Sequence, residues 1–317
     1  MKKKEKWPKV VIQNTLRISA LMSDFDGTLC PTSLVNHSLF QKSIPTIPPQ
    51  IEVSLLKISQ LIPVFIVSSK DFDLLHVTTK RFASTISCVL GIETINHIKH
   101  EDETVLDCIT ERRFSADTQT LTENSKILSH LLEQEKIQSY IHECDIRIDR
   151  KFTSCNKILI GITFDYRHLD NWEKFKKVDE PRLLEIIRRT INEHTQLGGA
   201  SYEMEPYIQT YTSHPFLDLY AVKCDKGLAF DSLFKRNSND PTLSDSITNT
   251  KNVLYLGDSE NDNPAFRRSD ISIGVSSDKR LNPKLACKYN IEFEHLSIFL
   301  NRLLENGLIF SENLLKF

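Results

Sequence analysis

Two aspartates that lie two residues apart, Asp24 and Asp26, follow the apolar run 16–22. A short apolar run predicts a buried strand, so the first carboxylate stands at the end of that strand. One carboxylate in such a pair can attack phosphorus while the other handles a proton. Gly27 permits a sharp turn, and Thr28 offers a hydroxyl and a backbone donor to a phosphate. The segment by itself fits a catalytic pair and an ordinary turn equally well, because Asp-Gly is a common turn dipeptide.

Three other polar segments contain residue types suited to the same chemistry. Ser68 ends the apolar run 64–67, Lys226 starts a predicted helix, and Asp258 and Asp262 follow the apolar run 253–256. Ligands of an open α/β sheet bind outside the carboxyl ends of the strands. We therefore expect these side chains to meet Asp24 if their strands are neighbours. The two carboxylates of the last segment are hard oxygen ligands of the kind that suits Mg²⁺.

The elements that would position these residues alternate at both ends of the chain. Apolar spacing predicts strands over 64–67, 253–256 and 271–275 and helices over 48–62, 71–83, 226–235 and 294–308. The middle of the chain is less regular, with helices predicted over 123–142 and 181–194 and a strand over 158–164. We expect an α/β fold with one parallel sheet, interrupted by an α+β insertion. The predicted division is residues 1–95 for the first part of the core, 96–214 for the insertion, and 215–317, including a strand over 216–222, for the second part.

Composition bounds the remaining possibilities. The 317 residues carry a net charge of −2 and 40% hydrophobic residues, which is typical of a soluble globular protein and gives no reason to expect nucleic acid or a membrane as partner. No apolar stretch approaches transmembrane length, so we predict a cytoplasmic protein. The seven cysteines lack C-x-x-C spacing, which disfavours a zinc site or a disulfide framework, and the histidines show no metal-ligand spacing. The oligomeric state stays open.

The order of the polar segments resembles that of a known family. Asp24-Phe-Asp-Gly-Thr-Leu, Val67-Ser68-Ser69-Lys70, Lys226-Gly-Leu-Ala and Gly257-Asp-Ser-Glu-Asn-Asp262 are similar to the four motifs of haloacid dehalogenase (HAD) superfamily phosphatases. The long insertion between the second and third motifs resembles a C2-type cap, as in the trehalose-6-phosphate and sucrose-phosphate phosphatases and the Cof-like branch. The resemblance implies a Rossmann-like parallel core with an inserted α+β cap.

The resemblance also implies roles for the matching residues. Asp24 would be the nucleophile that forms an aspartyl-phosphate, and Asp26 the general acid and base. Ser68 would hydrogen-bond the phosphoryl group, and Lys226 would offset negative charge. Such a site stabilises phosphoryl transfer by positioning and by cations.

The metal and the substrate contacts follow from the same resemblance. Mg²⁺ would be bound by Asp24, Asp258 and the backbone carbonyl of Asp26, with Asp262 completing or supporting the site. Predicted substrate-binding residues are Thr28, Ser69, Lys70 and Arg167. Sugar-phosphate members usually have Ser/Thr-Gly-Arg in the second motif, and here Lys70 keeps the charge but loses the bidentate fork, which places its role in substrate binding in doubt.

Specificity is expected to reside in the cap. The strand 158–164 continues into Asp165-Tyr166-Arg167, which resembles the His-Tyr-Arg-like strand end of trehalose-phosphate phosphatases. This similarity favours trehalose 6-phosphate, with sucrose phosphate, mannosyl-3-phosphoglycerate, and monosaccharide or nucleotide phosphates as alternatives. Candidate sugar-binding residues are Glu143, Arg147, Arg167, His168, Glu203 and Glu205.

The predicted function is Mg²⁺-dependent hydrolysis of a small-molecule phosphate ester. Two alternatives remain. A phosphomutase would keep the chemistry and return the phosphoryl group to a sugar. A catalytically silent HAD-like module would bind a sugar phosphate and regulate a synthase, although such a role needs no Asp24 nucleophile.

Overall fold

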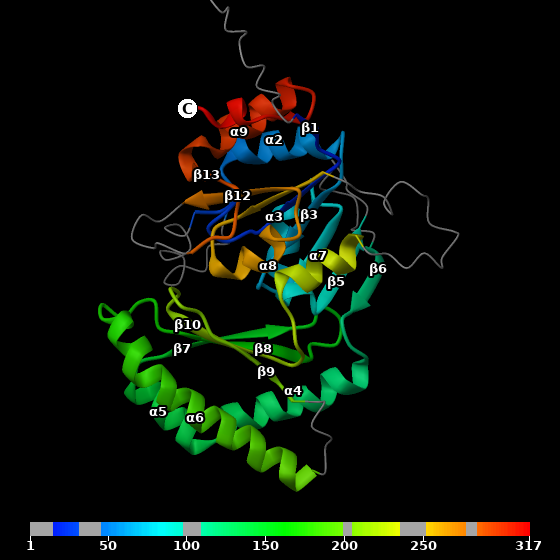
Figure 1. The fold of residues 1–317 in the computed structure, drawn as a ribbon. Coiled ribbons are helices and arrows are strands. Elements are labelled where there is room, and N and C mark those ends of the chain that lie inside the picture. Colours follow the sequence, from blue (N-terminus) through cyan, green and yellow to red (C-terminus); the bar gives the residue numbers. More distant parts are fainter. Residues whose placement is uncertain (1–14, 32–45, 98–108, 199–204, 235–251, 277–283) are drawn as a thin grey trace, which may run out of the picture.

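The structure, a computed structural model, describes residues 15–31, 46–97, 109–198, 205–234, 252–276 and 284–317. This part of the chain forms two sheets, the larger one packed between helices and the smaller one beneath its edge (Figure 1). The polar segment 236–252 lies almost entirely outside the described residues, as does the lysine-rich segment 2–6.

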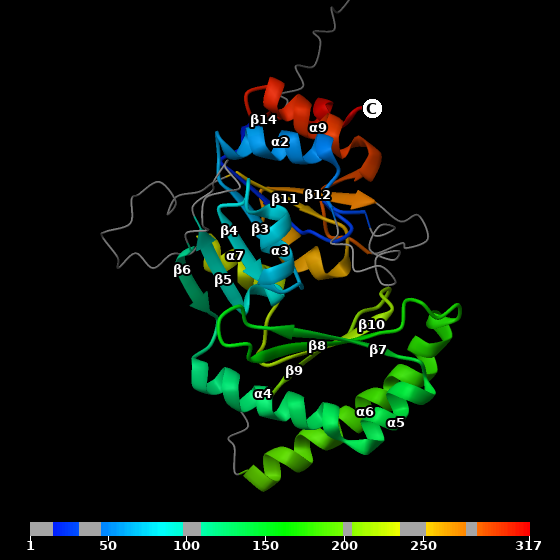
Figure 2. The ribbon, with the colours of Figure 1, turned by 180° about the vertical axis from the view of Figure 1, so that it is seen from behind.

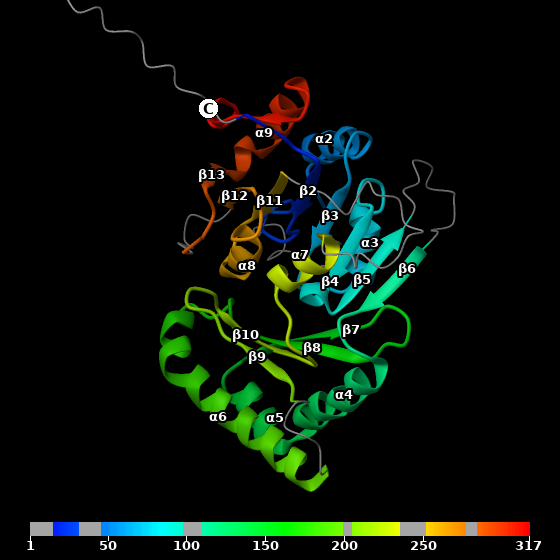
Figure 3. The same ribbon diagram turned by 45° about the vertical axis from the view of Figure 1, so that its right-hand side comes forward.

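The larger sheet carries the strands of the predicted α/β core. Within the described residues it has the order β13-β12-β11-β2-β3-β4-β5-β6. Strands β13 to β4 run parallel, whereas β5 and β6 are antiparallel additions at one edge (Figure 3). The bounds are β2 (Ala20–Ser23), β3 (Val64–Val67), β4 (Thr85–Cys88), β5 (Glu93–His97), β6 (Ile109–Phe114), β11 (Val253–Gly257), β12 (Ile271–Ser276) and β13 (Tyr289–Glu292). The expected α/β class is confirmed.

The strand predicted over 16–22 is two strands in the structure. Leu16–Arg17 forms β1, which pairs with β14 (Ile309–Phe310) outside the main sheet, and β2 begins at Ala20. Between β1 and β2, Ser19 N donates to Asn252 O at 3.3 Å.

Central strands of the sheet are buried on both faces, which explains why their sequences are continuous apolar runs. In β2, Leu21 packs into one apolar cluster while Ala20 and Met22 pack into another. The first cluster lies under α2 (Pro49–Ser59), α3 (Phe72–Thr79) and α9 (Phe293–Glu305), and the second lies under α7 (Lys226–Phe234) and α8 (Asn263–Phe266). Short 3₁₀ turns are η1 (Val89–Gly91), η3 (Glu260–Asp262) and η4 (Glu312–Leu315).

The smaller sheet belongs to the insertion. Its order is β7-β8-β10-β9 in the described part of the chain, and every pairing is antiparallel. The bounds are β7 (Arg147–Phe152), β8 (Leu159–Asp165), β9 (Tyr207–Gln209) and β10 (Phe216–Tyr220). Helices α4 (Thr118–Glu133), α5 (Glu135–Glu143) and α6 (Trp172–Gly198) cover the face that points away from the larger sheet (Figure 2). The other face is turned toward the carboxyl ends of the core strands.

Two helices of the insertion differ from the sequence-based expectation. The single helix predicted over 123–142 is divided into α4 and α5 at Gln134, whose backbone is extended with φ −66° and ψ 126°. The helix predicted over 181–194 begins earlier, at Trp172, and includes Pro181. Hydrophobic spacing finds helical faces correctly but does not detect a one-residue break.

Sheet membership divides the chain differently from the predicted boundaries. Position 96 lies inside β5, and the core sheet continues through β6 to Phe114. The strand predicted over 216–222 as part of the core is β10, which pairs with β8 in the smaller sheet. We propose that the insertion spans about residues 115–222, because the two connections between the sheets lie there.

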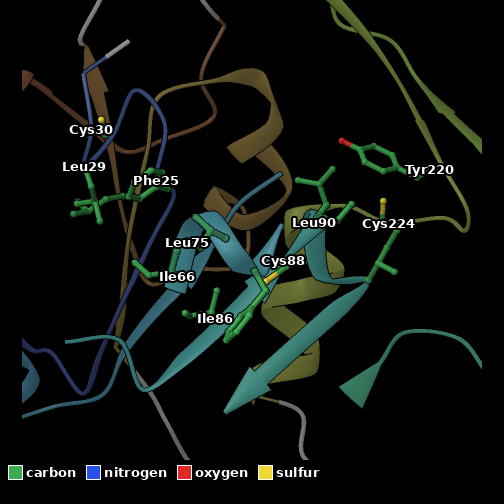
Figure 4. Packing of buried hydrophobic residues seen from close by; sticks show 14 of the residues in the cluster. Phe25, Leu29, Cys30, Ile66, Leu75, Ile86, Cys88, Leu90, Tyr220 and Cys224 are labelled. Carbon is green, nitrogen blue, oxygen red and sulfur yellow. The ribbon is translucent and has the colours of Figure 1, made fainter. Parts of the chain in front are cut away.

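The apolar core is continuous near these connections. Figure 4 shows part of it, with Phe25, Ile66, Cys88 and Leu90 of the core and Tyr220 of β10. All belong to one buried cluster that spans both sheets. Among the described residues, no helix is long and apolar enough to cross a membrane.

Candidate active site

The strand order places the predicted chemical residues at one edge of the sheet. Strands β11, β2 and β3 are adjacent and parallel, and they end just before Asp258, Asp24 and Ser68, respectively. The Asp24 N–H donates to Leu256 O at 2.9 Å, so the backbone of the first aspartate is fixed to the neighbouring strand. The convergence expected from the sequence is therefore present in the geometry.

Lys226 forms the centre of a buried charge cluster. Its Nζ lies 2.9 Å from Asp24 Oδ1 and 2.7 Å from Asp262 Oδ1, and the lysine is 2% exposed. Burial raises the pKa of Asp24 to about 7, because Lys226 offsets only part of the desolvation and Asp262 adds repulsion. Burial alone would lower the pKa of Lys226, but Asp24 and Asp262 outweigh it and raise that pKa, which keeps the ammonium charged.

Asp258 sits against the turn that follows Asp26. Gly27 has φ +79°, and a Cβ there would lie 1.9 Å from Asp258 Oδ2. Glycine is required at this turn for both the left-handed backbone and the close approach of the carboxylate. Thr28 Oγ1 donates to Asp258 Oδ1 at 3.4 Å, so its hydroxyl faces the carboxylate.

Asp262 has its hydrogen-bonding capacity largely filled by protein donors. Its Oδ1 accepts from Lys226 Nζ and from Tyr255 OH, each at 2.7 Å. Its Oδ2 accepts from the backbone N–H groups of Asp258 and Ser259 at 3.1 and 2.9 Å. Such a carboxylate holds the loop and the lysine in place more than it offers a free oxygen.

A metal ion fits this arrangement. Oxygen atoms of Asp24, Asp258 and Asp262 lie within 4.8 Å of one another. Burial and the repulsion from Asp24 and Asp262 raise the pKa of Asp258 well above its usual range, which indicates more negative charge than Lys226 neutralises. With Asp262 occupied by protein donors, Asp24 and Asp258 are the side chains best placed to hold a cation.

The site opens into a cavity of about 310 Å³ between the two sheets. Core residues on its wall include Asp24, Asp26, Ser69, Lys70, Lys226, Asp258 and Asn261. Residues of the insertion on the opposite wall include Arg147, Asp149, Lys151, Thr163, Asp165, Arg167, His214 and Asp218. Ser68 and Thr28 are buried behind the wall, at 1% and 0% exposure. Their predicted phosphate contacts stay predictions.

A buried polar network on the insertion faces the cavity. Asp218 Oδ2 accepts from Tyr211 OH at 2.6 Å and from Tyr220 OH at 3.0 Å. Its Oδ1 accepts from Thr163 Oγ1 and lies 3.5 Å from Lys151 Nζ, which also donates to Thr163. None of these residues belongs to a motif recognised in the sequence. Alternation along β7, β8 and β10 could have indicated them, since polar residues at every second position of a strand share a face.

The predicted substrate residues of the second motif and the cap occupy the wall in different ways. Lys70 Nζ lies 3.9 Å from Asp26 Oδ2 and 3.5 Å from Asp149 Oδ2. Arg167 forms a fork with Asp165, with Nη2 2.6 Å from Oδ2 and Nε 3.1 Å from Oδ1. Both predicted cations thus line the cavity while paired with carboxylates.

The remaining cap candidates have different environments. Arg147 lines the cavity. Glu143 and Glu205 are exposed outside its wall, and His168 pairs with Asp145 at 3.2 Å. Glu203 lies outside the described residues.

Two groups of hydrogen bonds join the insertion to the core. Glu93, buried in β5, accepts from Ser154 N at 2.9 Å and from Ser154 Oγ at 2.6 Å. Glu260 of η3 accepts from Thr212 N at 2.8 Å and from Ser213 Oγ at 2.7 Å. These bonds hold the insertion against the core.

Comparison with known proteins shows which fold this is. No family model matches the chain, and no curated protein matches its sequence. A trehalose-6-phosphate phosphatase related protein is 15% identical with a TM-score of 0.54, over 92% of this chain and 99% of that chain. The C-terminal domain of C. albicans trehalose-6-phosphate phosphatase is 13% identical with a TM-score of 0.58, over 91% and 92%. A haloacid dehalogenase-like hydrolase from Bacteroides thetaiotaomicron is 14% identical with a TM-score of 0.51, over 90% and 100%.

The chain therefore has the fold of the capped HAD phosphatases. The similarity extends over nearly the whole of each structure, so it includes both the core and the cap. The resemblance inferred from the motifs is confirmed at the level of the fold.

Proposed function

We propose that this protein is a Mg²⁺-dependent phosphomonoester hydrolase that works through an aspartyl-phosphate. The observation that carries the proposal is the Asp24 carboxylate, held 2.9 Å from the Lys226 ammonium at a strand end beside Asp258. Burying a lysine with two carboxylates costs free energy of folding, so such a cluster is expected at a functional site. Phosphoryl transfer requires a cation of this kind, because negative charge on the phosphoryl group must be stabilised.

In the first step, an Asp24 oxygen attacks phosphorus and the bond from phosphorus to the leaving oxygen breaks. The proton of Asp26 passes to that oxygen, so the product is a neutral alcohol. Lys226 favours the ionised form of the nucleophile and offsets negative charge on the phosphoryl group. Mg²⁺ held by Asp24, Asp258 and the Asp26 carbonyl would neutralise negative charge on the transferring phosphoryl group.

In the second step, a water molecule attacks the phosphorus of the aspartyl-phosphate. Asp26, now a carboxylate, accepts a proton from that water, and the bond between phosphorus and Asp24 breaks. Inorganic phosphate leaves and Asp26 is again protonated. The two aspartates thus return to their starting states.

The proposed substrate is a sugar phosphate such as trehalose 6-phosphate. The wall opposite Asp24 carries hydrogen-bond donors and acceptors and side chains of both charges, among them Lys151, Thr163 and Asp218. A polyhydroxylated leaving group matches such a wall, because each hydroxyl both donates and accepts. Two of the structures with the same fold are described as trehalose-6-phosphate phosphatase or a related protein, which supports this choice.

The proposal is tested by phosphate release. The native protein, with Mg²⁺, is expected to release inorganic phosphate from sugar phosphates, and Asp24→Asn to abolish release. Lys157→Met, which removes an exposed ion pair with Asp73, is the matched control and should leave turnover unchanged. Unchanged turnover in Asp24→Asn would overturn the assignment.

The same assay separates the alternatives. A phosphomutase would convert one sugar phosphate into another with little free phosphate. A silent module would bind sugar phosphates without turnover of any phosphate ester. A panel of disaccharide, monosaccharide and nucleotide phosphates identifies the alcohol that leaves.

A further inference from the structure

Lys70 stands between a core aspartate and a cap aspartate. Its Nζ is 3.9 Å from Asp26 Oδ2 and 3.5 Å from Asp149 Oδ2. These separations are longer than hydrogen bonds, so the ammonium attracts both carboxylates without being fixed to either. Asp149 lies on β7 of the insertion, whereas Lys70 and Asp26 lie on core loops. The lysine therefore bridges the two halves of the molecule at the cavity.

The carboxyl of Asp26 has few other constraints. Its Oδ1 is buried and has no hydrogen-bond partner among the described residues. By contrast, Asp262 has donors on both oxygens. The attraction of Lys70 for Oδ2 is thus positioned to set the rotation of the Asp26 carboxyl, and with it the direction in which a proton would be offered.

The backbone beneath Lys70 is held rigidly. Val89 N donates to Lys70 O at 3.0 Å, and Leu90 N donates to Ser68 O at 2.9 Å. Val89 and Leu90 have φ values of 45° and 55°, a conformation that costs free energy for side chains of their kind. A fixed loop leaves the Lys70 side chain as the part that can respond to Asp149.

The contact with Asp149 depends on where the cap lies. The Asp149 side chain is 50% exposed, and that of Lys70 is 23% exposed. Ion pairs at such exposure contribute little stability, so they can break and form again as a cap opens and closes. Asp149 can attract the Lys70 ammonium and offset its charge only when β7 lies over the core site.

We propose that Lys70 is a positioning residue that orients the carboxyl of the Asp26 acid, and that Asp149 of the cap sets the position of Lys70 on closure. This inference rests on the proposed phosphatase function. It links proton donation to the closed cap, so that the leaving oxygen is protonated only when the cap covers the substrate.

Leaving-group dependence tests the proposal. An alkyl phosphate needs a proton on its leaving oxygen, whereas p-nitrophenolate leaves readily without one. We expect Lys70→Met and Asp149→Asn each to lower kcat for sugar phosphates about tenfold, as a partial loss of acid catalysis. The kcat for p-nitrophenyl phosphate should stay within about twofold of the native value. Equal losses on both substrates would overturn the inference.

A double variant tests the order of action. If Asp149 acts through Lys70, the double variant should be no slower than Lys70→Met alone, because the two changes interrupt one connection. Losses that multiply would contradict the proposal. Lys70→Arg retains the charge and should restore part of the activity on sugar phosphates.

Matched controls separate this inference from the function on which it rests. Lys157→Met breaks a different contact between cap and core, 2.6 Å from Lys157 Nζ to Asp73 Oδ2, and should leave the ratio of the two kcat values unchanged. If Asp24→Asn loses the release of phosphate from p-nitrophenyl phosphate, that result supports the proposed function but does not bear on the role of Lys70. If the native protein releases phosphate but the Lys70 and Asp149 variants do not change the ratio, the inference fails and the function stands. If the native protein hydrolyses neither ester, both fail.

Discussion

The two walls of the cavity carry charge in different ways. On the core wall, Asp24, Lys226 and Asp262 form a cluster in which carboxylates exceed cations, and the pKa of Asp24 is raised by burial to about 7. On the cap wall, Asp218 is surrounded by Lys151 and by hydroxyl groups of Tyr211 and Tyr220. The core cluster has a deficit of positive charge, whereas the cap cluster is satisfied within itself.

This difference indicates separate tasks. A cluster with excess negative charge can bind a metal cation and can take part in a reaction that transfers charge. A network whose hydrogen-bonding groups all have partners can exchange hydrogen bonds with a polar ligand at little electrostatic cost. We therefore expect substitutions in the core cluster around Asp24 and Lys226 to affect turnover, and substitutions in the cap network around Asp218 to affect binding.

The largest expected contrast is between Asp24→Asn and Asp218→Asn. Loss of the nucleophile should lower kcat by about 10⁴-fold or more. Loss of the cap carboxylate should raise KM about tenfold with a much smaller change in kcat, as for a group that binds ground state and transition state alike. Steady-state kinetics on the best sugar phosphate would show the contrast. A loss confined to kcat in Asp218→Asn would remove the distinction between the walls.

Folding stability should separate the two buried lysines. Lys226→Met leaves Asp24 and Asp262 buried without their ammonium partner and should lower the free energy of unfolding by about 3–5 kcal/mol at neutral pH. Lys151→Met leaves Asp218 with three hydroxyl donors, so a loss of about 1–3 kcal/mol is expected. Urea unfolding without metal measures both. Equal losses would show that the cap network depends on Lys151 as strongly as the core depends on Lys226.

The raised pKa of Asp24 predicts how stability depends on pH. In the unfolded chain this carboxyl titrates near pH 4, whereas burial raises its pKa in the folded protein to about 7. The folded state therefore binds the proton more tightly, and the contribution of Asp24 to stability is present below about pH 4 and is lost as pH rises through about 7. Thermal unfolding in chelator should show this fall, and Asp24→Asn should reduce it. Mg²⁺ should also reduce it, since a cation favours the carboxylate.

The smallest expected effect concerns the contact of Glu260 with the insertion. Glu260→Ala removes the acceptor of Thr212 N and Ser213 Oγ and should raise KM about threefold, equivalent to one net hydrogen bond between core and cap. The free energy of unfolding should change little, because the contact of Glu260 with Thr212 and Ser213 is partly exposed. Isothermal titration with an unreactive sugar phosphate analogue would measure the weaker binding. A large fall in kcat instead would place Glu260 among the groups that act on the reaction.

Much of the core site could be predicted from short segments. Asp24, Ser68 and Asp258 each follow a continuous apolar run, and parallel strands bring such loops to one edge of a sheet. The sequence predicted a sharp turn at Gly27, and the structure adds that a side chain there would collide with Asp258. Local sequence sufficed because each residue is positioned by the strand that immediately precedes it.

The cap wall could not be predicted in the same way. Lys151, Thr163 and Asp218 lie on three different strands, and none belongs to a local motif. Their proximity depends on the pairing of β7 with β8 and of β8 with β10, which places Asp218 beside Thr163. The pairing of β10 with β8 could not be predicted for the same reason, since an apolar strand does not specify its partner.

The sequence by itself determined the α/β class, the order of the motifs and the chemistry that their side chains can perform. Those properties depend on residue type and on neighbours along the chain. Only the tertiary structure decided that Asp262 has its oxygens occupied by protein donors, that Lys70 faces both Asp26 and Asp149, and that the cap contributes a buried network to the cavity. These facts depend on distances between segments far apart in the chain, which packing of the two sheets sets and local sequence does not.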